Sequence, residues 1–258
     1  AISTALLGLL QAGDHVLSQD CLYGGTRSLL AEDLPRYGID CTFIDADDPQ
    51  SWKAALRPNT RVFYCEAMTN PLLQVADLDG IAAFSRANGL YALIDNTMAT
   101  PLYFRPLAHG FHLSLHSCTK YMNGHSDIVA GAVIGSDELV GRVKHRLDHL
   151  GGSLDPHACF LLHRGLKTMG LRVRKQSENA MELARFLAGH RLVRRVYYPG
   201  LSTHPSHQRA KSLMEGFGVT EVAPSSPAAI EIKALAKEVM KMIPKIKDEE
   251  ESRSRELA

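Results

Sequence analysis

Residues 116–127 read His-Ser-Cys-Thr-Lys-Tyr-Met-Asn-Gly-His-Ser-Asp, and this stretch carries more information than any other in the chain. The segment that leads into it, 113–118, alternates enough to predict a short buried strand. Lys120 therefore leaves a strand end on a turn rich in hydroxyl residues, where an amine can be desolvated and held as a Schiff-base nucleophile. Ser117 and Thr119 flank it at a spacing of two, so both hydroxyls can point toward a phosphate. A lysine after a strand is most often simply exposed, so the pattern needs support from elsewhere.

A second strand end supplies that support. Residues 90–94 read Leu-Tyr-Ala-Leu-Ile, an apolar strand that stops at Asp95. A carboxylate at the carboxyl end of a buried strand lies where ligands bind in α/β sheets, and it can pair with a protonated ring nitrogen. An isolated Asp-Asn is more often an Asx turn or a helix cap. However, only 25 residues separate Asp95 from Lys120, room for one short connection, so both strand ends can converge on one small molecule.

Two glycines and a proline mark two more candidate segments. Residues 22–26 read Leu-Tyr-Gly-Gly-Thr, a turn whose backbone N–H groups can approach an anion while Thr26 caps the following helix and Tyr23 presents its ring. A Gly-Gly pair alone is more often a tight turn. Asn70 follows another strand, and Pro71 biases it away from helix, which leaves its amide extended at the mouth of the sheet. An ordinary strand-to-helix loop fits this segment as well.

Strands and helices alternate along the first two thirds of the chain. Strands are predicted at 15–18, 41–45, 61–65, 90–94, 113–118 and 130–134, and helices at 26–35, 50–56, 78–88 and 136–148. Residues 156–189 are mainly helical, and 194–198 is predicted to be a lone strand that enters a smaller domain. This order predicts the α/β class, with a mostly parallel sheet covered by helices on both faces.

Composition narrows the class of protein. With 258 residues and 45% hydrophobic content the chain can bury a large core, and its net charge of +1 argues against nucleic acid or an anionic membrane as partner. No apolar run approaches the ~18 residues of a membrane span, and no signal peptide opens the chain. The 12 histidines show no metal-binding spacing, so no metal is expected. Five dispersed cysteines indicate free thiols in a reducing compartment, hence a cytoplasmic location.

Together the four segments resemble the Cys/Met-metabolism family of pyridoxal-phosphate (PLP) enzymes, which includes cystathionine γ-lyases, γ-synthases and β-lyases and methionine γ-lyases. The resemblance runs from residue 1 to about 218, and 117–127 is its most specific part. It implies the large domain of a fold-type I PLP-dependent transferase with only the start of a smaller C-terminal domain. The implied parts are 1–155 as the PLP-binding large domain, 156–218 as linking helices and the start of the small domain, and 219–258 as a divergent, charged helical tail.

The resemblance also assigns the chemistry. Lys120 would form the Schiff base with PLP and then carry the proton at the substrate Cα. Asp95 would keep the pyridine nitrogen protonated, so that the ring accepts the electrons left on Cα. Tyr23 would stack on the ring and serve as an acid or base near the leaving group.

Four further side chains would hold the cofactor. The resemblance implies that Ser117 and Thr119 bind the phosphate, that Asn70 hydrogen-bonds the phenolic oxygen of the ring, and that Thr97 packs against the ring face.

A nucleotide-binding transferase on a similar sheet has little support, because no Gly-x-Gly-x-x-Gly or phosphate-loop lysine motif is present.

Two positions favour one branch of the family. Methionine γ-lyases usually carry a cysteine where this chain has Gly25, and a glycine where it has Ser126. Both differences resemble cystathionine γ-lyases and γ-synthases. We therefore expect γ-elimination from cystathionine, giving cysteine, 2-oxobutanoate and ammonia. The alternatives are γ-replacement on an acylated homoserine, methionine γ-elimination, and a non-catalytic family remnant that still binds PLP or pairs with subunits.

The two ends of the chain depart from the family pattern. Family members carry an N-terminal arm and a Gly-Met pair that reach a PLP phosphate, and a C-terminal domain whose arginine grips the substrate carboxylate; neither is recognisable here. Residues 229–246 suit an amphipathic helix, and 247–258 are almost wholly charged. We therefore expect an apparently truncated member that takes a small sulfur amino acid and forms a homo-oligomer, a dimer of dimers in the family, weakened here.

Overall fold

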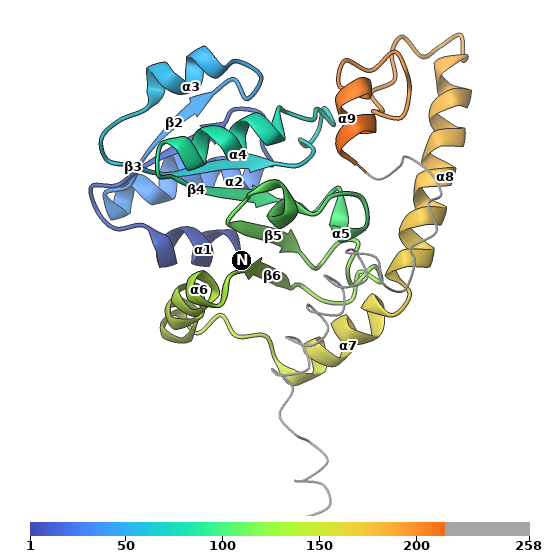
Figure 1. The fold of residues 1–258 in the computed structure, drawn as a ribbon. Helices are drawn as coiled ribbons and strands as arrows, with labels where there is room; N and C mark the ends of the chain where they lie inside the picture. Colours follow the sequence, from blue (N-terminus) through green and yellow to red (C-terminus); the bar gives the residue numbers. More distant parts are fainter. Residues whose placement is uncertain (215–258) are drawn as a thin grey trace, which may run out of the picture.

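The computed structural model describes residues 1–214, which form a six-stranded sheet with the order β2-β1-β3-β4-β5-β6 (Figure 1). Strands β1 to β5 run parallel, and β6 pairs antiparallel with β5. The strands are β1 (His15–Gln19), β2 (Asp40–Ile44), β3 (Thr60–Glu66), β4 (Tyr91–Asp95), β5 (Leu113–Ser117) and β6 (Gly131–Gly135). Each lies within one residue of its predicted bounds, and the mostly parallel α/β sheet is confirmed.

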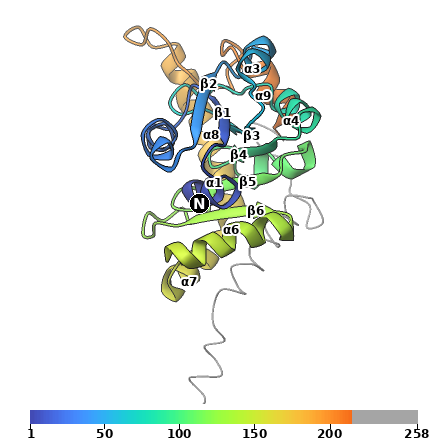
Figure 2. The same cartoon turned by 90° about the vertical axis from the view of Figure 1, so that its left-hand side faces the viewer.

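Helices cover both faces of this sheet (Figures 1 and 2). The helices are α1 (Ile2–Leu9), α2 (Gly24–Ser28), α3 (Pro49–Ala55), α4 (Leu78–Ala87), α5 (Thr100–Tyr103), α6 (Asp137–Leu150), α7 (Pro156–Leu166), α8 (Met169–Ala188) and α9 (His207–Leu213), with short turns of other helix types at η1 (Leu29–Asp33), η2 (Leu34–Tyr37) and η3 (Pro106–His109). In Figure 1, α7 and α8 run along one side of the molecule and lead to α9. None of the helices within residues 1–214 combines the length and apolarity that a membrane crossing requires.

Strand β3 shows how the sequence builds two cores from one sheet. Successive side chains of a strand point to opposite faces. Accordingly Phe63 and Cys65 join the core under α3 and α4, while Val62 and Tyr64 join the core under α1 and α6. Trp52 of α3 meets Phe63 edge-on, with ring centroids 5.5 Å apart. Burial on both faces explains why the strands read as nearly continuous apolar runs.

Two sequence predictions were wrong in detail. The helix predicted at 26–35 begins earlier, so Tyr23, and not Thr26, occupies the N-cap position, and Thr26 lies inside α2. The segment then changes helix type at η1 and η2, because Pro35 has no N–H for a regular α-helical bond, and it ends at Gly38 in the left-handed region.

Residues 194–198 do not form the predicted strand. A lone strand is not stable without a neighbour to pair with. Within residues 1–214, none of the six strands of the sheet pairs with this segment. The helix predicted at 229–246 and the charged tail at 247–258 lie outside the described residues. All five cysteines are free thiols, as predicted.

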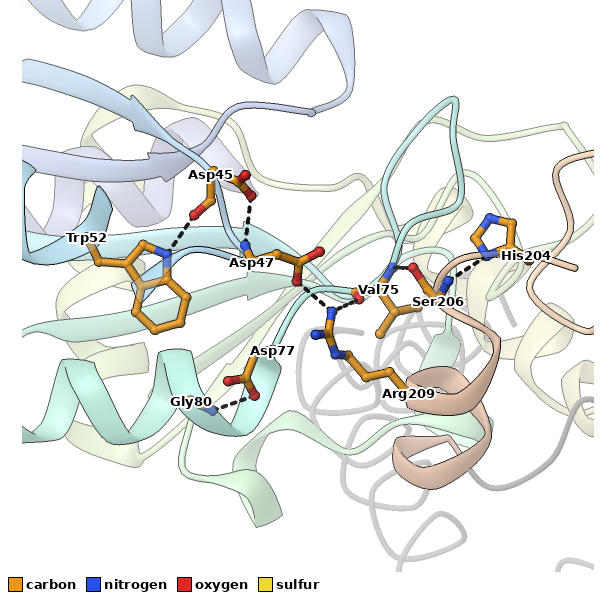
Figure 3. A network of polar contacts seen from close by, with 9 residues as sticks. All are labelled: Asp45, Asp47, Trp52, Val75, Asp77, Gly80, His204, Ser206 and Arg209. Carbon is orange, nitrogen blue, oxygen red and sulfur yellow. Dashed lines mark hydrogen bonds and ion pairs between the residues drawn. The ribbon is translucent and has the colours of Figure 1, made fainter. Parts of the chain in front are cut away.

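The segment around α9 packs against the loop that contains Val75 and against Asp47 (Figure 3). Ser206 Oγ accepts a hydrogen bond from the Val75 N–H (3.1 Å), and Arg209 donates to the Val75 carbonyl (2.8 Å) and to the carboxylate of Asp47. Beside them, Ala210 is buried in the core under α4. These contacts fix the loop that leads from the end of β3 into α4.

Candidate active site

A cavity of about 1030 Å³ opens at the carboxyl ends of β3, β4 and β5. This edge is where ligands bind in open parallel sheets. The lining includes the seven residues whose side chains were assigned to the site: Tyr23, Asn70, Asp95, Thr97, Ser117, Thr119 and Lys120. The glycines of the 22–26 turn and Thr26 are not part of the lining. Lys120 and Asp95 therefore face the same space, as a shared ring would require.

Asp95 is the last residue of β4, and Thr97 fixes its orientation. The Thr97 N–H (2.9 Å) and hydroxyl (2.5 Å) both donate to Asp95 Oδ1, and neither bond involves Oδ2. Burial raises the pKa of the Asp95 carboxyl, and the bonds from Thr97 oppose that rise. The Ser117 N–H donates to the same threonine hydroxyl (2.7 Å), which ties the ends of β4 and β5 together. A cation beside Oδ2 would offset the cost of burying this carboxylate.

Lys120 lies on a tight turn directly after β5. Its N–H donates to the Ser117 carbonyl (3.2 Å), and its own carbonyl accepts from the Gly124 N–H (2.7 Å). The lysine side chain is exposed and lines the cavity. The turn therefore presents the amine on a closed loop of backbone hydrogen bonds.

The long helix α8 supports this turn from behind. Arg172 donates to the carbonyls of Tyr121 (2.9 Å) and Met122 (3.2 Å), the two residues after the lysine. Gly124 has φ +74°, and a Cβ there would meet the Arg172 guanidinium. Likewise a Cβ at Gly165 would clash with the Asn123 carbonyl oxygen. Two glycines thus allow α7 and α8 to approach the lysine turn closely.

The two hydroxyls beside Lys120 differ in their partners. Thr119 Oγ1 donates to the Ala130 carbonyl (3.2 Å) and accepts from the Ala130 N–H (3.0 Å), so it joins the lysine turn to the segment before β6. In the bonds described above, Ser117 takes part only through its backbone N–H and carbonyl. Both residues line the cavity. To donate a hydrogen bond to a phosphate, the Thr119 hydroxyl would have to give up its hydrogen bond to the Ala130 carbonyl.

Tyr23 occupies the N-cap of α2 and is 56% exposed at the cavity. Its ring lies over Gly25: a Cβ at position 25 would be 2.8 Å from Tyr23 Cε1. Glycine at position 25 therefore decides where the tyrosine ring can rest. Asn70, on the opposite loop, is also exposed at the cavity.

Sequence reasoning missed Glu66, the last residue of β3. It lines the cavity but is only 4% exposed, and burial raises the pKa of its carboxyl to about 7, with hydrogen bonds from backbone N–H groups opposing the rise and the charge of Asp95 adding to it. Glu66 pairs in register with Asp95 on β4. An acid that ends a buried strand was the same signal that singled out Asp95, and it was overlooked here.

The donor set fits PLP. An amine suits the aldehyde, a carboxylate suits the pyridine nitrogen, hydroxyls and an amide suit the phosphate and phenolic oxygens, and an exposed aromatic ring suits stacking. Within residues 1–214, no group of three or more His, Cys, Asp or Glu side chains is arranged to bind a metal ion.

Comparison with known proteins agrees with this chemistry. A family model described as Cys/Met metabolism PLP-dependent enzyme matches residues 1–243. A probable cystathionine γ-synthase from Herpetosiphon aurantiacus is 43% identical over 217 residues, covering 84% of this chain and 68% of the relative. Cystathionine γ-lyase from Bacillus subtilis is 42% identical (84% and 58%), and L-methionine γ-lyase from Fusobacterium nucleatum is 41% identical (84% and 56%).

A solved structure supports the fold. The crystal structure of cystathionine γ-lyase from Lactobacillus plantarum complexed with L-serine superposes with a TM-score of 0.79 at 36% identity, covering 84% of this chain and 58% of that one. The chain thus spans between about half and two thirds of the length of these relatives. On the match of the family model and the identity to these relatives, the chain belongs to the Cys/Met metabolism family of PLP-dependent enzymes.

Proposed function

We propose that this protein is a PLP-dependent carbon–sulfur lyase that takes a small sulfur amino acid, and that its reaction is γ-elimination from cystathionine, giving cysteine, 2-oxobutanoate and ammonia. One observation carries the proposal: Lys120 and Asp95 open into a single cavity at the carboxyl ends of neighbouring strands. The names of the relatives support carbon–sulfur chemistry, since they include cystathionine γ-lyase and methionine γ-lyase.

PLP, when bound, supplies an electron sink for the bonds at the substrate Cα. Asp95 would hold a proton on the ring nitrogen through Oδ2, because Thr97 already occupies Oδ1. Lys120 Nζ would anchor the cofactor and then remove and return the proton at Cα. The phenol of Tyr23, exposed at the cavity, would give or take a proton at the departing sulfur.

Gly25 and Ser126 support cystathionine over methionine as the substrate. A cysteine at position 25, usual in methionine γ-lyases, would bring a side chain against the Tyr23 ring. The relatives themselves do not separate the two, because both activities occur at 41–42% identity. The same positions also suit γ-replacement on an acylated homoserine, the runner-up.

Borohydride trapping tests the cofactor part of the proposal. The purified chain incubated with PLP should develop an absorption band near roughly 420 nm, and borohydride should fix the cofactor onto Lys120, as peptide mass mapping would show. Lys120→Ala should lose the band and at least about 10³-fold in activity. Lys175→Ala, an exposed lysine on α8 paired with Glu178, is the matched control and should behave as wild type.

Turnover of cystathionine, methionine and O-succinylhomoserine then separates the activities. Faster turnover of cystathionine supports the lyase, and faster replacement on O-succinylhomoserine supports the synthase. Absence of the trapped band would overturn the proposal as a whole. A band without turnover of any of the three would leave a cofactor-binding protein and overturn the lyase assignment.

A further inference from the structure

We propose that Glu66 is a positioning residue that holds Tyr23 and Asn70 on opposite sides of the cofactor, so that one buried carboxylate sets the width of the cavity between them. This inference rests on the proposed function, because it concerns where two cofactor-contacting side chains are held. It assigns a role to a residue that is central to the site but has no place in the chemistry described above.

The two oxygens of Glu66 reach two different loops. Oε1 accepts from the Tyr23 N–H at 2.7 Å, and Oε2 accepts from the Asn70 N–H at 3.2 Å. The first loop follows β1 and opens α2, and the second follows β3. Hydrogen bonds to a carboxylate are about twice as strong as those between neutral groups. A single side chain therefore links the backbones of both loops.

Glu66 is itself held on a rigid base. Its N–H donates to the buried side chain of Gln19 on β1 (3.0 Å), and β3 lies between β1 and β4 in the sheet. The next residue, Ala67, donates to the carbonyl of Asp95 (2.9 Å). The carboxylate thus transmits the geometry of three central strands to the loops, as a precise site requires.

This arrangement argues against a direct catalytic role for Glu66. Each oxygen already accepts a backbone N–H, and the side chain is 4% exposed. A general base must come within hydrogen-bond reach of the proton that it removes, and very little of this side chain is open to the cavity. The side chains of Tyr23 and Asn70, by contrast, are exposed at the cavity. Glu66 therefore acts through its two partners.

Three variants of the full chain test the inference. Glu66→Gln replaces one accepting oxygen by a donor, and Glu66→Asp keeps the charge but withdraws both oxygens by one methylene. The matched control is Asp14→Asn, a buried carboxylate at the opposite edge of the sheet that accepts one backbone N–H, from Gln11 (2.9 Å). Folding is checked by circular dichroism and urea unfolding, and the PLP dissociation constant is measured by equilibrium dialysis.

We expect Glu66→Gln and Glu66→Asp to weaken PLP binding about tenfold or more, and Asp14→Asn to change it less than twofold. The decisive readout is a mutant cycle: in a Tyr23→Ala/Asn70→Ala background, Glu66→Gln should weaken binding less than twofold, because its partners no longer contact the cofactor. Glu66→Gln should also shift the visible absorption maximum in the same direction as Asn70→Ala.

The full tenfold loss in the Tyr23→Ala/Asn70→Ala background would overturn the inference, and so would a Glu66→Gln variant that binds PLP like Asp14→Asn. If Glu66→Gln does not fold, the same cycle is run with Glu66→Asp. A wild-type chain that forms no borohydride-trapped adduct would instead refute the proposed function, so the two failures are distinguishable.

Discussion

The parallel strands all begin at one edge of the sheet, the amino edge, and all end at the opposite one, the carboxyl edge. These two edges use polar side chains in opposite ways. At the amino edge, buried His15 bonds to Thr60 Oγ1 through Nδ1 (2.8 Å) and to Thr42 Oγ1 through Nε2 (2.9 Å). At the carboxyl edge, Asp95 and Lys120 face a cavity. Polar groups that bond to one another stabilise the fold, whereas polar groups left facing a cavity cost stability and remain able to bind a ligand.

The largest effect should come from the amino edge. His15→Ala removes a fully buried ring and takes one of two hydrogen-bond partners from each threonine hydroxyl, Arg57 being the other, so the free energy of unfolding should fall by about 3 kcal/mol. PLP affinity should stay within twofold, because the ring lies at the far edge from the cavity. Urea unfolding and equilibrium dialysis measure the two quantities. His149→Ala, an exposed histidine on α6, is the control. A loss of affinity without a loss of stability would contradict the comparison.

A smaller, opposite pattern is expected at the carboxyl edge. Asp95→Asn should weaken PLP binding by about 2 kcal/mol, roughly 30-fold, because a charged partner for the ring nitrogen becomes neutral. The unfolding free energy without cofactor should be unchanged or higher, since burial disfavours the ionised carboxylate and raises its pKa. Equilibrium dialysis and urea unfolding again measure the two quantities, with exposed Asp148→Asn as the control. If Asp95→Asn binds PLP within threefold of the wild-type affinity, the proposed difference between the two edges is wrong.

The most sensitive test is the pH dependence of stability. Burial lowers the pKa of His15 to about 4 from 6.5, so the unfolded chain binds more protons between these values, and stability is lost as pH falls through that window. Burial raises the pKa of Glu66 to about 7 from 4.5. Between these two pH values the folded chain binds more protons than the unfolded chain, so stability is lost as pH rises through this window. The two edges therefore contribute slopes of opposite sign.

Urea unfolding at pH 5, 6 and 7 separates the two contributions. His15→Gln should flatten the loss of stability on acidification, and Glu66→Gln should make stability rise more steeply with pH, each by at most about 1.4 kcal/mol per pH unit. His149→Gln serves as an exposed control. Curves that stay parallel to wild type in both variants would show that neither group titrates differently on folding.

Strands and the main site residues were predictable because their signals are local. An apolar run that stops at a polar residue marks both a buried strand and the functional edge, which is why Asp95 and Lys120 could be named from the sequence. Residues 194–198, Arg-Arg-Val-Tyr-Tyr, misled the same reasoning, since β-branched and aromatic residues do not form a strand without a pairing neighbour.

Contacts between distant segments were not predictable. Glu66 reaches Tyr23 across 43 positions, and Arg172 reaches Tyr121 across 51. The wrong cap at Thr26 has a related cause, because the start of α2 depends on how Tyr23 is held by Glu66. Neither spacing nor residue type indicates which backbone groups a side chain will meet.

By itself the sequence determined the α/β class, the six strands, the free thiols and most of the polar residues around the cavity, though not Glu66, because each depends on hydrophobic pattern or on chemistry within a few positions. Only the tertiary structure decided that these residues share one cavity and that Glu66 joins its two walls. It also decided that α8 supports the lysine turn. The physical reason is that parallel strands bring their carboxyl ends to one edge, where side chains far apart in the chain come within hydrogen-bonding distance.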